Sequence, residues 1–319
     1  MSVAVETRSS RATGRPGRRN ALRSSGDWAR RAPLLPALVF TIIVTQLPFI
    51  ATLVISFMDW NAYYPNERRF AGFANFRRVI TDVNMRSAVV TTIILTASVV
   101  IVSLVLGLLI ALLLDRKFFG RGAVRTMMIA PFLVVPVAAA LVWKHALYNP
   151  EYGLLNGVIT KIWSVLGSSN PPQRDWITSN PLISIEAALI WQWTPFMMLI
   201  LLAGLQSRPL DVIEAAKIDG ASSMQIFWHM TMPHLRQYLE LGGLLGSIYV
   251  VQNFDAVFTI TSGGLGTANL PYAIYQTFYN AHDYGRASAA GVVVVIGTIL
   301  IATLALRTVS TLFREETAR

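Results

Sequence analysis

Apolar residues are concentrated in six long runs along the chain, separated by short polar segments. Each run is long enough to cross about 30 Å of hydrocarbon at a helical rise of about 1.5 Å per residue. Six such runs leave too little polar chain to cover them in water, so we expect an all-α membrane protein with six transmembrane helices. The predicted spans are residues 34–57, 87–114, 124–147, 182–205, 239–258 and 287–306. The fifth run is the weakest, because glycines and the polar Asn253 and Asp255 interrupt it.

The composition is typical of a chain whose solvent is mostly lipid. Hydrophobic residues make up 54% of the 319 residues and charged residues only 14%, against about 25% in ordinary soluble proteins. The sequence contains no cysteine, and its four histidines have no zinc-motif spacing, so we expect no metal site and no cofactor. A net charge of +10 is also typical of nucleic-acid-binding proteins. Here, however, the basic residues lie in the short segments between apolar runs, so membrane lipid and not nucleic acid is the expected partner.

The distribution of Lys and Arg predicts the orientation of the chain in the cell membrane. Residues 1–33 are rich in Arg, Ser, Gly and Pro, and we predict a disordered basic cytoplasmic tail there. A transmembrane domain over 34–314 and a short cytoplasmic tail over 315–319 follow. With the N-terminus inside, the inner segments carry 18 Lys and Arg and the outer segments carry 9. This ratio predicts that both termini are cytoplasmic.

The segment between the fourth and fifth runs, residues 208–235, is predicted to form two short helices joined by a turn. Pro209 is typical of a helix start, and Gly220 of a helix end, where glycine most easily adopts a positive φ. A second amphipathic stretch over 224–230 follows, and we expect Pro233 to end it. A polar hairpin with an apolar stripe predicts a partner surface outside the membrane.

This segment resembles the EAA loop of permease subunits of ATP-binding-cassette (ABC) importers. Glu214-Ala215-Ala216 is followed after three residues by Gly220, and after nine more by Met230-Thr231-Met232-Pro233. The family pattern ends in Ile-x-Leu-Pro, so the two methionines are conservative departures. The resemblance implies that the loop 208–235 is a coupling helix that docks in a cleft of an ATPase subunit. The coupling residues that it implies are Glu214, Ala215, Ala216, Asp219, Gly220, Phe227 and Pro233.

The resemblance extends over nearly the whole chain after the tail. Phe70-x-Gly72-x-x-Asn75-Phe76 is similar to a segment of carbohydrate-importer permeases. Residues 253–264 are similar to another, with Leu265 where proline is usual. Residues 191–196 and 226–235 most resemble permeases for sugar alcohols such as mannitol and sorbitol. The family implies a type I ABC-importer permease fold and a sugar or polyol substrate. It also implies three kinds of partner: a second permease subunit, expected as a heterodimer; two ATP-binding subunits; and an extracytoplasmic solute-binding protein.

Polar groups inside the spans are candidates for the substrate path, because their burial in lipid is costly. Hydrogen-bonding groups and flat aromatic faces at this depth suit an uncharged polyhydroxylated ligand. The alternative for each residue is packing or hydrogen bonding between helices. The candidates are Gln192, Trp193, Thr194, Tyr249, Gln252, Asn253 and Asp255.

No phosphate-binding loop and no nucleophile–base pair is visible in the sequence. We therefore expect no catalytic residue and no enzymatic activity in this chain, with ATP hydrolysed by partner subunits. Three alternatives remain open: an ABC permease for another small polar solute, a secondary transporter, and a membrane-embedded enzyme. A secondary transporter would need ion-coupling carboxylates at mid-depth and no docking loop.

The predicted orientation is tested by reporter fusions. A reporter joined after Tyr152 is expected to report the outside, and one joined after Arg121 the inside, because the charge count places these loops on opposite sides. Alkaline phosphatase and a fluorescent protein serve as complementary reporters. The reverse pattern would contradict the orientation.

Overall fold

The computed structural model describes residues 32–167 and 171–299, and these are mainly helical. Residues up to Ala51 and residues from Thr52 onward form two units, each described here by itself. The described part of the first unit contains η1 (Ala32–Leu34), α2 (Leu35–Thr41), the π-helical η2 (Ile42–Gln46) and the first half of α3 (Leu47–Ser56), a helix that crosses the boundary between the units. Its apolar side chains are almost all exposed, as expected of a helix surrounded by lipid or by another subunit.

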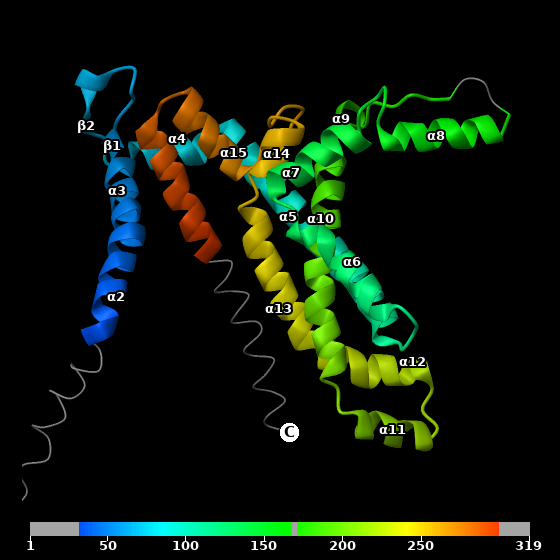
Figure 1. The fold of residues 1–319 in the computed structure, drawn as a ribbon. Helices are drawn as coiled ribbons and strands as arrows, with labels where there is room; N and C mark the ends of the chain where they lie inside the picture. Colours follow the sequence, from blue (N-terminus) through cyan, green and yellow to red (C-terminus); the bar gives the residue numbers. More distant parts are fainter. Residues whose placement is uncertain (1–31, 168–170, 300–319) are drawn as a thin grey trace, which may run out of the picture. The chain divides into compact units, whose positions relative to one another are not determined.

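The core of the second unit is the pair α5 (Val83–Asp115) and α10 (Pro181–Gln206), with α13 (Met232–Val251) packed against both (Figure 1). Leu95 of α5 and Ile185 of α10 are fully buried in this interface. Gly107 lets the two backbones approach closely, because a Cβ there would lie 2.8 Å from the backbone nitrogen of Met198. Small residues have this role at many helix interfaces in membranes.

Three helices of the described residues are long and apolar enough to cross a membrane: Leu35–Ser56, Val83–Asp115 and Pro181–Gln206. A bent pair of helices forms a fourth span if the two are counted as one. Its first half is α6 (Arg121–Leu133), and its second half consists of α7 (Pro136–Leu141) and the π-helical η4 (Val142–Leu147). The helix Tyr284–Ile299 is shorter and apolar. Residues 1–31 and 300–319 lie outside the described residues, and with them most of the predicted tail 1–33, the predicted tail 315–319 and the end of the sixth predicted span.

The third predicted span, 124–147, is not one continuous helix. The two halves of the bent pair meet at an angle of 94°. Val134 and Val135 are extended at the break, because the residue before a proline is disfavoured in helical geometry and Pro136 begins the next helix.

The fifth span also differs from its predicted range of 239–258. The structure begins α13 earlier, at Met232, and ends it at Val251; α14 (Asp255–Ile260) follows after a break. The prediction that Pro233 ends a helix is wrong, because α12 (Ser223–Ile226) continues through the π-helical η5 (Phe227–Thr231) into α13. The wider turn accommodates the proline ring, which would clash with a carbonyl in a regular α-helix interior.

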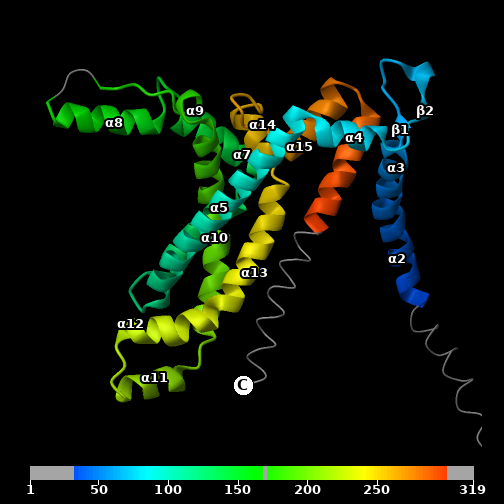
Figure 2. The same cartoon turned by 180° about the vertical axis from the view of Figure 1, so that it is seen from behind.

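Short elements gather at the end of the second unit opposite α11 (Leu210–Ile218), as both views show (Figures 1 and 2). The strands β1 (Met58–Asp59) and β2 (Arg69–Phe70) pair antiparallel, Met58 opposite Phe70 and Asp59 opposite Arg69. None of these short elements was among the predicted ranges. The remaining elements are η3 (Pro65–Glu67), α4 (Ala74–Thr81), α8 (Leu154–Val165), α9 (Trp176–Ser179), α15 (Leu270–Tyr275) and η6 (Gln276–Asn280).

Two polar side chains, Asn75 and Asp82, attach these elements to the spans. The buried Asn75 side chain donates to the carbonyls of Ser56 (3.0 Å) and Met58 (2.8 Å). Asp82 accepts from the Met85 amide at the start of α5 (2.9 Å) and forms an ion pair with Arg286. The Met85 hydrogen bond first, and then the Arg286 charge, lower the pKa of the Asp82 carboxyl.

Substitution of Gly107 tests the packing of α5 against α10. Gly107→Ala is expected to lower the midpoint of thermal unfolding in detergent, because overpacking at a backbone contact costs about 1–3 kcal/mol. Gly157→Ala on α8 is the matched control, since a Cβ there meets nothing within 4 Å. Equal melting temperatures for the two variants would contradict the close approach.

Candidate coupling loop and substrate path

The turn between α11 and α12 is a Schellman motif centred on Gly220. Gly220 has a φ of +87°, in the left-handed region that glycine adopts most easily. The Ala221 amide donates to the Ala216 carbonyl at 2.9 Å, and the Gly220 amide donates to the Lys217 carbonyl at 3.1 Å. The predicted end of the first helix at Gly220 is therefore confirmed.

The second helix of the hairpin begins with a capping box. The Ser222 hydroxyl accepts from the Gln225 amide at 3.4 Å, and the Gln225 side chain accepts from the Ser222 amide at 2.8 Å. Ser and Gln three residues apart are the recognised sequence signal for this motif, and our sequence analysis missed it. The turn is therefore held by hydrogen bonds on both sides of Ala221.

The outer surface of this hairpin is apolar and uncovered. None of the described residues of α11 is buried, and Ile218 is 86% exposed. Met224 and Trp228 continue this surface along α12 and η5, at 66% and 56% exposed. Glu214 and Asp219 add exposed carboxylates, so the hairpin presents both apolar contacts and negative charge.

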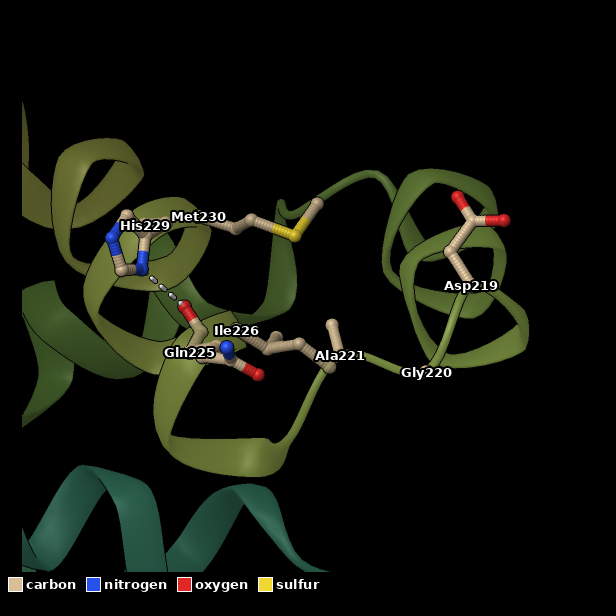
Figure 3. A pocket seen from close by; sticks show the side chains of 7 residues that line it. All are labelled: Asp219, Gly220, Ala221, Gln225, Ile226, His229 and Met230. Carbon is tan, nitrogen blue, oxygen red and sulfur yellow. Dashed lines mark hydrogen bonds between the residues drawn. The ribbon is translucent and has the colours of Figure 1, made fainter.

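A hollow of about 440 Å³ opens between the two helices. Figure 3 shows Met230 extending across it and the Asp219 carboxylate on the opposite side; His229 shares a hydrogen bond of 3.0 Å with the Gln225 carbonyl. The lining residues are Asp219, Gly220, Ala221, Gln225, Ile226, His229 and Met230. Of the other predicted coupling residues, Phe227 lies on the second helix with its ring 5.2 Å from that of Trp228.

Two of the predicted path residues stack on each other. The rings of Trp193 on α10 and Tyr249 on α13 lie 5.5 Å apart at an interplanar angle of 26°. Phe132 of α6 contacts Trp193 edge-on at 5.7 Å, which extends the aromatic group to a third helix. Tyr249 is 56% exposed and Gln252 is also exposed, so neither side chain is buried within this subunit.

Of the other predicted path residues, Gln192 joins two separate helices, and Thr194 and Asn253 make local contacts. Gln192 is buried and donates to the Val134 carbonyl at 3.1 Å, at the break between α6 and α7. The Thr194 hydroxyl donates to the Ile190 carbonyl of its own helix at 2.6 Å. Asn253 accepts from the Ala256 amide at 3.3 Å, and Asp255 lies in the first turn of α14. For Gln192 the structure therefore shows the helix-joining contact raised above as the alternative, whereas the Asn253 side chain makes a local contact at the start of α14.

One acidic residue inside a span was missed. Glu186 lies within α10 and accepts a hydrogen bond from the Ser98 hydroxyl of α5 at 2.6 Å. It precedes Trp193 by seven residues, which is two helical turns, so both residues lie on the same face of α10. A carboxyl group inside an otherwise apolar run was the available signal, because ionisable residues within spans are functional candidates by default.

Comparison with known proteins identifies the class. Residues 103–314 match the family of binding-protein-dependent transport system inner membrane components, and the chain belongs to this family. It is a permease subunit of an ABC importer, a transport component and not an enzyme.

The relatives and a solved structure agree with this class. The chain is 32% identical over 271 residues to a probable ABC transporter permease protein, y4oQ, of Sinorhizobium fredii, covering 84% of this chain and 85% of the relative. It is 33% identical over 266 residues to the trehalose/maltose transport system permease protein MalF of Thermococcus litoralis, covering 82% and 87%. A crystal structure of a bacterial alginate ABC transporter, in complex with an alginate pentasaccharide-bound periplasmic protein, contains a chain with the same fold. The TM-score is 0.76 at 20% identity, over 90% of this chain and 96% of that chain.

Substitution of Gln192 tests whether its side chain stabilises the contact between α10 and the break before α7. Gln192→Ala is expected to reduce thermal stability by about 1–3 kcal/mol, because the half-buried Val134 carbonyl loses its partner. Gln252→Ala, at an exposed position, is expected to leave stability unchanged and is the control. Stability is measured by thermal unfolding of the purified protein in detergent. Unchanged stability of the Gln192→Ala variant would contradict the joining role.

Proposed function

We propose that this chain forms, with a second permease subunit, the membrane path of a carbohydrate importer, and that α11 couples it to an ATPase subunit. The observation that carries the proposal is the α11–α12 hairpin. It combines a preformed turn at Gly220, an exposed apolar surface and the exposed Glu214. A short helix that buries no residue within its own subunit receives little stabilisation from packing there. We therefore expect α11 to be stabilised by contact with a partner.

The hairpin defines which end of the second unit faces the ATPase. It lies opposite α8, α9 and α14 in both views (Figures 1 and 2). The count of Lys and Arg supports a cytoplasmic location for the hairpin and for both termini. The binding protein then docks at the end that carries α8 and α14.

A neutral carbohydrate suits the accessible groups of the path. The stacked pair Trp193 and Tyr249 offers flat aromatic surface, and Gln252 offers a donor and an acceptor. The names of relatives for trehalose and maltose, and the alginate transporter with the same fold, support a carbohydrate. Within this class, the likeness of residues 191–196 and 226–235 to sugar-alcohol permeases favours a polyol.

The partners follow from the same assignment. We infer a heterodimer with a second permease chain, two ATP-binding subunits beneath it, and an extracytoplasmic solute-binding protein. The periplasmic protein present in the alginate transporter complex supports the last of these. Coupling would use Glu214 as the charge partner of a basic group in the ATPase cleft and Gly220 as the turn.

The decisive experiment changes the turn without changing its surroundings. A Cβ at Gly220 meets nothing within 4 Å, so a substitution acts only through backbone strain, about 1–2 kcal/mol for an L-residue in the left-handed region. Gly220→Val is expected to abolish uptake and weaken retention of the ATPase subunits. Gly220→Asn is the matched control, because asparagine tolerates this conformation, and it is expected to retain most activity.

Glu214→Ala is expected to reduce uptake with a milder loss of assembly, because alanine preserves the helix while removing the charge. The importer is reconstituted in proteoliposomes with its partner subunits and binding protein. ATPase retention is measured by pull-down, and uptake with radiolabelled trehalose, maltose and mannitol. Full uptake and normal ATPase retention in the Gly220→Val variant would refute the coupling role.

A further inference from the structure

Three consecutive residues at the end of α10 bind three different parts of the second unit. They are Gln206, Ser207 and Arg208, here called the junction residues. They lie directly before Pro209 and the start of α11. One of the two chain connections between the coupling hairpin and the spans therefore passes through them; the other runs through η5 into α13.

Arg208 joins the end of α10 to two other elements. Its Nη2 lies 2.5 Å from the Asp115 carboxylate at the end of α5, and its Nη1 donates to the Thr231 hydroxyl at 3.1 Å. Its Nε donates to the Leu205 carbonyl at 2.8 Å. Because Thr231 lies at the far end of the hairpin, one guanidinium joins the entry of the hairpin, its exit and α5. The planar fork of arginine allows this, and lysine has no equivalent geometry.

The other two junction residues extend the attachment to α13 and α6. The Ser207 hydroxyl lies 2.8 Å from the Tyr238 hydroxyl and 3.1 Å from His234 Nε2, both on α13. The Gln206 amide oxygen accepts from Arg121 and Arg125 of α6, at 2.8 Å each, in the amide orientation that satisfies its neighbours.

The Arg208–Asp115 pair is sheltered enough to hold a fixed geometry. The side chains of Arg208 and Asp115 are only 15% and 27% exposed, and charge-assisted hydrogen bonds in such settings are short and directional. The pair Arg236–Glu240 gives a contrast. It is spaced i,i+4 within α13, its Arg236 side chain is 51% exposed, and it joins no separate elements. Exposed pairs of that kind contribute little.

We propose that Arg208 is a positioning residue that fixes the coupling hairpin to α5 and η5, so that movement of α11 is transmitted to the spans. This inference rests on the proposed coupling function of α11. It goes beyond that function because Arg208 lies outside the Glu-Ala-Ala…Gly motif and acts by attachment and not by contact with the ATPase.

The experiment measures how firmly the hairpin is attached. The chain contains no cysteine, so Leu109→Cys on α5 and Lys217→Cys on α11 introduce two spin-label sites that are unique within this chain. Both positions are exposed, and neither belongs to the apolar surface of the hairpin. Distances between the labels are measured by pulsed electron paramagnetic resonance in the assembled importer without nucleotide, and ATPase retention is measured by pull-down on the same samples.

The parent is expected to give one narrow distance distribution. Arg208→Ala and Asp115→Ala are expected to lose the narrow peak while the ATPase subunits stay bound. Arg208→Lys is expected to give an intermediate width, because it keeps the charge but loses the fork. Arg236→Ala is the control and is expected to match the parent. The proposal is overturned if the Arg208→Ala variant keeps the narrow parental distribution. A failure of the coupling function itself is detected separately, as normal ATPase retention in the Gly220→Val variant.

Discussion

The absence of water from the hydrocarbon layer is the constraint on which this fold depends, because each backbone amide and carbonyl must find a partner within the protein. In a regular helix the backbone amides and carbonyls bond to one another and meet this requirement. In this structure the helices are interrupted at a few positions, where the freed backbone groups need other partners. At the break before Pro136 the Val134 carbonyl accepts from Gln192. At the break after α13 the Asn253 carbonyl accepts from Asn269 at 2.5 Å. Side-chain amides from neighbouring elements thus make irregular backbone tolerable inside the spans.

This constraint also explains the roles of the polar residues within apolar runs. A glutamine or asparagine in such a run is a candidate ligand contact from its sequence alone, and the same amide is equally suited to a freed carbonyl. Gln192 illustrates this, because its side chain donates to the Val134 carbonyl, whereas the Asn253 side chain accepts from the Ala256 amide at the start of α14. Tyr249 and Gln252 are exposed instead. Whether a polar side chain pairs with backbone or stays exposed depends on where a neighbouring helix is interrupted. The sequence of the helix that carries the side chain does not contain that information.

Other parts of the molecule were predictable to the extent that their determinants are local. The positive φ of Gly220 follows from the role of glycine at helix ends, and the long apolar runs of α5 and α10 follow from hydropathy. The continuation of the helix past Pro233 was not predicted, because it depends on a π-helical turn that has no simple sequence signal. The junction at Arg208 joins positions 93 residues apart in the chain, so no local pattern reveals it.

The hairpin turn has a further consequence for assembly. The hydrogen bonds of the Schellman motif and of the capping box lie between Ala216 and Gln225, so ten consecutive residues determine the shape of the turn. A docking element that is already ordered loses little conformational entropy when it associates, whereas a disordered one must be ordered at that moment. Under the coupling role proposed above, the affinity of the contact with the ATPase would therefore depend mainly on surface fit and charge, with little contribution from folding on binding.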